Sequence, residues 1–295
     1  MDWRGRRQSS NVDDRRGQPV RASAGGGLML LVRILPWLLR SRGGRVVLGL
    51  GIVAFFGARM AGIDLLQLAG PMPQQTTRFS AEEQQLAEFV SVVLADTEET
   101  WQAQFAKVGR RYEEPVLVLF SQRVSSACGA ASSAVGPFYC PGDRKVYLDL
   151  SFFRDLDKQL GAPGDFAQAY VVAHEVGHHI QTLLGISQQV RAAGEGKRAS
   201  VVNALSVRQE LQADCLAGVW GHAAQRYSNM LEPGDLEEAL QAAASIGDDR
   251  LQRRAGGEVV PDSFTHGTSA QRVEWFRRGF ESGDMDSCDT FSAQL

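Results

Sequence analysis

Histidine and cysteine are both scarce in this 295-residue chain, and their scarcity excludes several kinds of site. Only five histidines are present, and three of them fall within 174–179. The four cysteines form no C-x-x-C pair, so a zinc site built from thiolates is not expected. The chain also lacks internal repeats, nucleic-acid-binding motifs and any basic patch interleaved with aromatic residues. We therefore expect no nucleic-acid partner, and no feature specifies an oligomeric state.

Charge is distributed unevenly along the chain. Apolar residues make up 44% and charged residues 22%, which is typical of a globular protein. Residues 1–60 contain eleven Arg and three Asp, so they carry +8, whereas the remaining residues carry −11. A basic arm on an acidic body is typical of proteins that contact nucleic acid or a membrane.

A hydrophobic run over 46–63 favours the membrane. Its 18 residues would form about 27 Å of helix, close to the roughly 30 Å of a bilayer's hydrocarbon core, and Arg59 is its only charge. We predict one transmembrane helix here; the alternative is a buried core helix. The shorter run 28–39 carries Arg33 and Pro36, so we expect it to lie at the membrane interface.

The arginines before residue 46 set the expected topology and domain boundaries. By the positive-inside rule they keep the N-terminus in the cytoplasm and send the rest of the chain across the membrane. We expect residues 1–45 to be a basic arm that is disordered at least over 1–27. Residues 64–79 then form a linker and residues 80–295 form the folded domain.

Two pairs of cysteines suit a domain outside the cytoplasm, where disulfides persist. Cys128 and Cys140 bracket a loop rich in Gly, Ala and Ser. Cys215 lies on an expected helix and Cys288 near the C-terminus, so a bridge between them would fasten the tail to the core. The alternative is four reduced thiols.

The pattern of apolar residues predicts an α+β fold that is mainly helical, with a small sheet. Two short apolar segments are expected as strands, and the second is a candidate edge strand beside the central helix. The strands are 115–120 and 145–150, and the helices are 80–107, 151–160, one through 171–181, 200–227, 233–253 and 269–280.

The central helix carries His174-Glu175-x-x-His178, the H-E-x-x-H spacing. Residues four apart lie on one face of a helix, so both imidazoles can bind the same cation. Glu175 can then reach a water at the metal's open position, as in zinc hydrolases. The alternative is a surface helix that happens to carry two histidines.

A catalytic zinc needs a third protein ligand, and a later helix offers Glu210. Asp214 lies four residues further on the same face, where it could accept the free ring N–H of a ligand histidine, His174 being the best candidate. The alternative is an ordinary solvated acidic pair, which is common on helices.

At these motifs the chain resembles the gluzincin metallopeptidases and, more narrowly, the bacterial putative neutral zinc metallopeptidase family. The resemblance covers roughly residues 128–291. It implies a zincin-like domain, one Zn²⁺ per chain, a peptide or protein substrate and attachment to the inner or cell membrane of a bacterium, with the domain periplasmic or extracellular. It rests on the segments 140–141, 147–149, 174–181, 208–215, 265–268 and 288–291.

The segment from Thr265 to Arg272 resembles the Thr-His-Pro-x-x-x-x-Arg element of membrane gluzincins, with Gly267 in place of Pro. That resemblance implies that His266 stabilises the oxyanion and that Arg272 orients the loop. A structural or helix-capping histidine is the alternative.

These observations predict a membrane-anchored zinc peptidase. A metal-activated water would attack the peptide bond with Glu175 as the general base. One alternative is a catalytically inert, zinc-stabilised binding or scaffold protein of the cell envelope. Another is a membrane-anchored adaptor whose acidic body recruits basic proteins.

Overall fold

The computed structural model describes residues 1–18, 40, 43 and 79–294. Met1–Gln18 and Phe79–Leu295 together form one compact unit. The predicted transmembrane segment 46–63, the interfacial segment 28–39 and nearly all of the linker 64–79 lie outside the described residues. None of the described helices combines the length and the hydrophobicity that a bilayer span requires.

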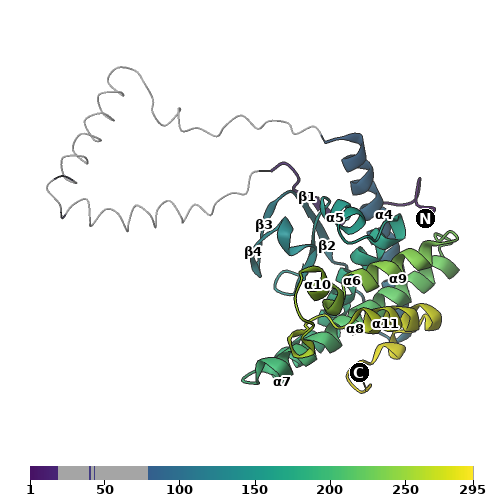
Figure 1. The fold of residues 1–295 in the computed structure, drawn as a ribbon. Coiled ribbons are helices and arrows are strands. Elements are labelled where there is room, and N and C mark those ends of the chain that lie inside the picture. The colour runs from purple at the N-terminus through teal and green to yellow at the C-terminus, as the bar shows by residue number, and fades with distance from the viewer. Residues whose placement is uncertain (19–39, 41–42, 44–78, 295) are drawn as a thin grey trace. The chain divides into compact units, whose positions relative to one another are not determined.

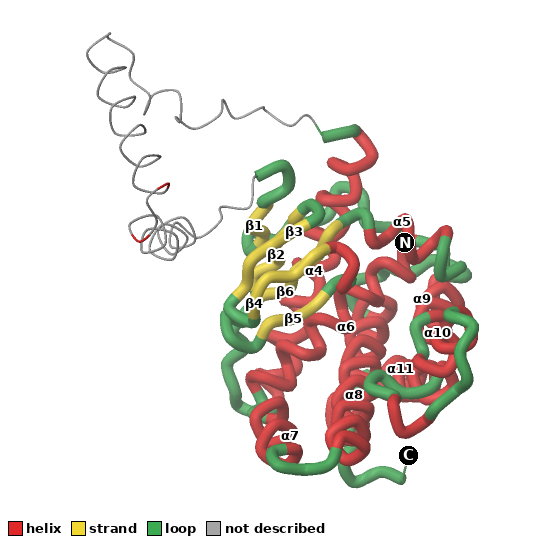
Figure 2. The backbone as a smooth tube through the Cα atoms, turned by 60° about the vertical axis from the view of Figure 1, so that its left-hand side comes forward, coloured by secondary structure: helices red, strands yellow, loops and turns green. Residues whose placement is uncertain are grey.

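Helices dominate the domain, and a small sheet lies to one side of them (Figures 1 and 2). The predicted mainly helical α+β architecture is therefore confirmed. Helix α8 packs against both α6 and α11, and α9 packs against α6 and α11. The helices are α4 (Ala81–Lys107), α5 (Phe152–Lys158), α6 (Asp165–Leu183), α7 (Ile186–Gly194), α8 (Ala199–Arg226), α9 (Asp235–Ser245), α10 (Asp248–Arg254) and α11 (Ser269–Ser282).

Capping residues set the start of two of these helices. Ser80 and Glu83 form a reciprocal capping box at the start of α4, and Thr268 and Gln271 form another at α11. Each box satisfies backbone N–H groups that have no partner inside the helix. The predicted starts near residues 80 and 269 are accordingly confirmed.

The main sheet has four strands in the order β1-β2-β6-β5. Strands β1 (Val12–Asp14), β2 (Val116–Phe120) and β6 (Lys145–Asp149) are parallel, and β5 (Phe138–Cys140) is antiparallel to β6. The prediction of β6 as the edge strand is wrong, because β5 pairs along its outer side. A separate hairpin joins β3 (Arg123–Ser126) to β4 (Gly129–Ser132).

Alternation along the strands divides the core in two. Leu117 and Leu119 of β2 face the main core, which includes α4 and α6. Val118 and Phe120 face the opposite way and pack with Val124 of the hairpin in a smaller cluster. The sheet is therefore covered on both faces, as its parallel strands require.

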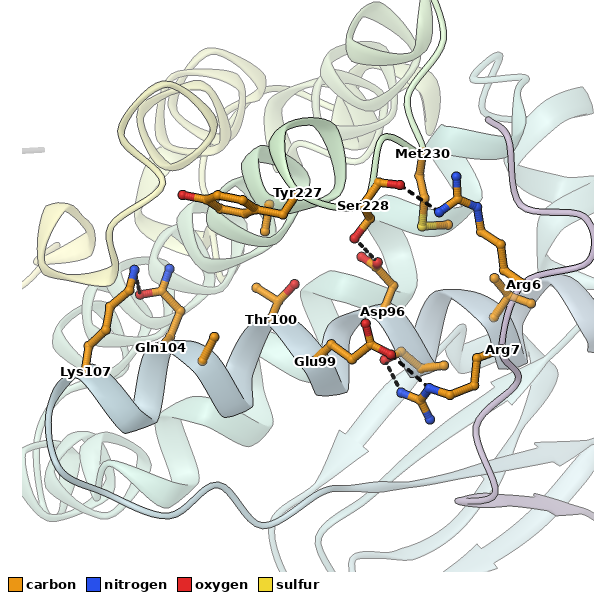
Figure 3. A pocket seen from close by; sticks show the side chains of 14 residues that line it. Arg6, Arg7, Asp96, Glu99, Thr100, Gln104, Lys107, Tyr227, Ser228 and Met230 are labelled. Carbon is orange, nitrogen blue, oxygen red and sulfur yellow. Dashed lines mark hydrogen bonds and ion pairs between the residues drawn. The ribbon is translucent and has the colours of Figure 1, made fainter.

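The N-terminal segment, residues 1–18, is part of this domain, so the prediction of disorder is wrong for these residues. Its strand β1 pairs with β2, and Arg7 forms an ion pair of 3.1 Å with the buried carboxylate of Glu98. Figure 3 shows Arg6 and Arg7 beside α4, with Arg6 donating to the Ser228 carbonyl. Arginines of this segment, whose charge suggested a solvated arm, are thus bound by partners within the domain.

The helix predicted over 233–253 is divided into α9 and α10. Gly247 separates them in an extended conformation, and a Cβ there would collide with the backbone of Ser269. The break places Asp248 at the start of α10, where its carboxylate accepts backbone N–H groups from Thr265 and His266. This close approach is tertiary, so apolar spacing alone does not reveal it.

Both predicted disulfides are confirmed. Cys128–Cys140 ties the β3–β4 hairpin to β5. Cys215–Cys288 ties α8 to the C-terminal tail. No cysteine in the described part of the chain is free.

Candidate metal centre

The H-E-x-x-H motif lies in the middle of α6, which is buried over most of its length. Gly177 sits against α8: a Cβ at this position would lie 2.9 Å from the carbonyl oxygen of Ala213. The missing side chain lets the two helices approach closely. This approach brings the α8 carboxylates to the face of α6 that carries the histidines.

His174, His178 and Glu210 meet between the two helices. Glu210 Oε2 lies 3.2 Å from His174 Nε2, and Glu210 Oε1 lies 3.4 Å from His178 Nε2. One ligand atom from each residue lies within 4.8 Å of the other two. The structure therefore brings together the three residues that the sequence predicted as metal ligands.

Asp214 fixes the orientation of His174. Its Oδ1 lies 2.9 Å from His174 Nδ1, which is the predicted contact. Asp214 also accepts hydrogen bonds from Tyr170 Oη at 2.5 Å and from Arg272 Nε at 2.8 Å. Burial opposes ionisation of this carboxyl, but Arg272 and His174 outweigh it and lower the pKa of Asp214 to about 2. The ionised carboxylate holds the His174 proton on Nδ1 and leaves Nε2 free to bind a metal.

Gln181 plays the corresponding part for His178. Its Oε1 lies 2.9 Å from His178 Nδ1, and its amide nitrogen donates to the carbonyl of Gln209 and to Gln212. Gln181 was not among the residues predicted from the sequence as partners of the ligand histidines. The available signal was its position three residues after His178, within reach on the same helix.

The electrostatics of the centre favour a bound cation. Burial opposes charge on His174, but Asp214 and Glu210 prevail and raise its pKa to about 10. The pKa of His178 is also raised, because Glu210 outweighs the effect of burial. Against its own burial, the pKa of Glu210 is held well below its usual range by His178 and His174. A negative site of this kind takes up protons when no metal is present.

Glu175 is buried in the wall of the same cavity but is not one of the three clustered residues. Burial raises the pKa of its carboxyl, an effect that the two histidines partly offset. A raised pKa suits a group that takes a proton from water and gives it up again.

The donor set fits zinc. Two imidazoles and one carboxylate form the ligand set of a known class of catalytic zinc site, which keeps a further position for water. The ring nitrogens not facing the centre both have hydrogen-bond partners, as metal-binding histidines usually do. Asp165, Asp235 and Glu238 also cluster, but the Met1 amino group contacts Asp165 and Asp235. We therefore assign no metal to this second group.

His266 lies in the wall of the metal cavity. Its Nδ1 is 3.3 Å from Asp248, and this carboxylate raises the pKa of the His266 ring. Arg272, which was predicted to orient this loop, binds Asp214, and Asp248 accepts the backbone N–H groups of the loop. No spacing pattern marks Asp248 in the sequence.

Two neighbouring side chains have partners outside the ligand cluster. Tyr147 donates to Asp143. His179 is fully buried, with Nε2 2.6 Å from the Glu113 carbonyl and Nδ1 3.1 Å from Tyr139 Oη. Through Tyr139, His179 connects the metal helix to the edge strand β5.

The metal cavity has a volume of about 500 Å³ and reaches from α6 and α8 to β5 and α10. A separate cavity of about 630 Å³ lies between α4, the end of α8 and the N-terminal segment (Figure 3). Its buried Asp96 is already bound by Trp220 and Ser228. That cavity contains no histidine, so we assign it no part in metal chemistry.

Comparisons with known proteins give a consistent picture. The model of a family described as "Putative neutral zinc metallopeptidase" matches residues 1–291. "Uncharacterized protein YpfJ" of Escherichia coli (strain K12) is 51% identical over 299 residues, which cover 100% of both chains. "Uncharacterized protein Rv2575" of Mycobacterium tuberculosis (strain ATCC 25618 / H37Rv) is 46% identical over 192 residues, 62% of this chain and 64% of that protein. No solved structure matches the chain.

Proposed function

The chain belongs to the putative neutral zinc metallopeptidase family, and we propose that it is a zinc-dependent peptidase. One observation carries the proposal: the Nε2 atoms of His174 and His178 and the carboxylate of Glu210 converge between α6 and α8. We assign these three residues as ligands of one zinc ion. When bound, the zinc acts as a Lewis acid and lowers the pKa of water towards about 7.

The surrounding side chains supply the remaining chemistry. Glu175 accepts the proton of the water that attacks the peptide carbonyl, and then gives this proton to the leaving amine. Asp214 and Gln181 hold the two histidines in the tautomer that presents Nε2. Burial keeps the carboxylates of Glu175 and Asp214 and the two imidazole rings away from bulk water, which strengthens each of these interactions.

His266 is the best placed side chain to bind the developing oxyanion. It lines the metal cavity, and its Nδ1 lies 3.3 Å from Asp248. Asp248 raises the pKa of this ring, which favours the protonated form that can donate a hydrogen bond.

We also propose that residues 46–63 attach the protein to a bacterial membrane, but not as the single transmembrane span that the sequence predicted. Strands β1 and β2 share hydrogen bonds, so residues 1–18 and the metal centre must lie on the same side of that membrane. Two disulfides in the domain favour the oxidising side for both. This arrangement replaces the sequence prediction of a cytoplasmic N-terminus and a domain across the membrane.

Sidedness can be measured with exposed cysteines introduced at Ser10 and at Glu281. A membrane-impermeant maleimide added to intact spheroplasts should label both, because both positions belong to one domain on the oxidising side, and labelling of neither would place that domain in the cytoplasm. Labelling of only one of them would contradict the revised topology.

The peptidase itself is tested by zinc analysis and by a peptide-library assay, each with and without chelator. Glu175→Gln should keep one zinc per chain and lose cleavage by about 10²- to 10⁴-fold. Glu210→Ala should lose the zinc, whereas Glu237→Gln, an exposed glutamate on α9, should change neither. A wild-type chain that binds zinc but cleaves nothing in the library would instead be the zinc-stabilised scaffold.

A further inference from the structure

Outside the centre itself, most side chains in the walls of the metal cavity are uncharged. Besides His174, Glu175, His178 and Glu210, its lining residues include only two ionisable groups of the kind that could bind a charged chain end, His266 and Arg272. Arg272 is 2% exposed and bound to Asp214. His266 is bound to Asp248.

This composition matters because exopeptidases must recognise the end of a chain. A free α-amino group needs a carboxylate to pair with, and a free α-carboxylate needs a cation. Within the described lining of the cavity, each carboxylate belongs to the zinc chemistry and each cation already has a carboxylate partner. A substrate end buried beside the scissile bond would therefore be left unpaired.

The cavity also continues beyond the centre. Pro141, Ser187 and Gln209 line both the metal cavity and a second hollow of about 480 Å³ between α7 and α8. The charged residues that line this second hollow are Arg191 and Glu195. A substrate chain thus has room to run past the zinc position instead of ending there.

Apolar side chains and a free strand edge line the other part of the cavity. Val135 is 64% exposed and Leu251 is 36% exposed, and both lie in the cavity wall. Strand β5, also in this wall, pairs on one side with β6 and with no other described strand. An extended peptide can add to such an edge while its side chains contact the apolar walls.

Building on the proposed function, we infer that the protein is an endopeptidase. Its substrate class is an extended internal segment with apolar side chains beside the scissile bond. Neither end of the substrate chain is recognised at the centre.

The test uses the zinc-loaded full chain and three peptides of the same sequence, about ten residues long with Leu and Phe at the middle. One peptide has both ends blocked by acetyl and amide groups, one has only a free N-terminus and one has only a free C-terminus. Mass spectrometry then locates the cuts. We expect internal cleavage of all three with kcat/KM values that agree within about threefold.

A variant pair tests the apolar wall. Leu251→Asp should lower kcat/KM for these peptides by about tenfold, the order that one apolar contact in a pocket provides. Val260→Asp, which changes an apolar residue that is 47% exposed outside the cavity, should leave kcat/KM unchanged. Equal effects of the two variants would contradict the assigned wall.

The outcomes separate this inference from the proposed function. Release of single residues from a free end, with no cut in the blocked peptide, would overturn the endopeptidase assignment and leave the peptidase intact. Absence of any cleavage by the zinc-loaded chain, both of these peptides and of the peptide library, would overturn both.

Discussion

The side-chain oxygen of Gln181 lies 2.9 Å from Nδ1 of His178, and the amide nitrogen of the same Gln181 donates to the Gln209 carbonyl. Because the nitrogen is used as a donor, the oxygen must accept the ring proton. Gln181 therefore fixes the tautomer of His178 while connecting α6 to α8. Gln212 extends the same network to the Cys288 carbonyl in the disulfide-bound tail.

Replacing Gln181 by Leu should weaken zinc binding by about 10- to 100-fold, the usual cost of losing a partner of a metal-binding histidine. Gln181→Glu keeps an acceptor for Nδ1 and should recover part of the affinity. Competition with a zinc chelator measures both. His222→Gln is the control, since His222 binds the Phe280 carbonyl away from the centre; a similar loss there would argue against a specific part for Gln181.

Zinc binding should weaken as the pH falls. In the absence of metal, Asp214 and Glu210 raise the pKa of His174 to about 10 against the effect of burial, so this ring is protonated at pH 7. Zinc must displace that proton, and affinity should fall about tenfold per pH unit for each proton displaced. Calorimetry at pH 7 in two buffers of different ionisation enthalpy should show release of at least one proton per zinc. Zero release would mean that the free site is unprotonated.

Removing the charge of Arg272 should destabilise the fold. Arg272 and Asp214 are both buried and bound at 2.8 Å, so Arg272→Met leaves a buried carboxylate without its cation and should cost about 3–5 kcal/mol of unfolding free energy. Arg278→Met breaks an exposed pair with Glu274 and should cost less than about 1 kcal/mol. Chemical denaturation measures both variants, and comparable losses would refute this assignment of the buried pair.

The two disulfides should contribute unequally. Cys215–Cys288 closes a loop of 73 residues and Cys128–Cys140 one of 12. In the chain-entropy account, their removal should cost about 4 and about 3 kcal/mol respectively. Paired Cys→Ser variants compared by denaturation test this order. Only the longer bridge connects to Gln212, so its loss should also lower zinc affinity, and an effect confined to the shorter bridge would contradict the proposed connection.

The connection 19–78 should be dispensable for folding of the domain. Its ends lie close together, since the Arg16 guanidinium stacks on the Phe79 ring at 4.2 Å. A chain in which a short Gly/Ser linker replaces residues 19–78 should keep its zinc and its thermal stability. Deletion of residues 1–78 should not, because Glu98 would lose Arg7, Ser9 and Asn11 as partners. Equal stability of the two chains would show that the N-terminal segment contributes little.

The sequence was sufficient to name the residues of the candidate metal centre, because the spacing within each helix is local. His174 and His178 share a face of α6, Glu210 and Asp214 share a face of α8, and Gly177 allows these faces to meet. The shared face within each helix follows from the 3.6-residue period, whereas the meeting of the two helices is a tertiary contact.

Contacts between distant segments were beyond such an analysis. Strand β1 is three residues long and pairs with a strand about a hundred residues later, so neither its composition nor its period marks it. The break at Gly247, the carboxylate of Asp248 and the Asp214 partner of Arg272 also depend on segments that meet only in the fold. The free edge at β5 was missed for the same reason, since a three-residue strand has no clear alternation.

Strand β1 has a consequence for proteolytic processing. A single cut within residues 19–78 would leave two polypeptides, and the shorter would still be held by its ladder to β2 and by the pairing of Arg7 with Glu98. Such a nick would not shed the domain as a fragment beginning near residue 79. The product would be a two-chain complex that separates only when the sheet itself unfolds.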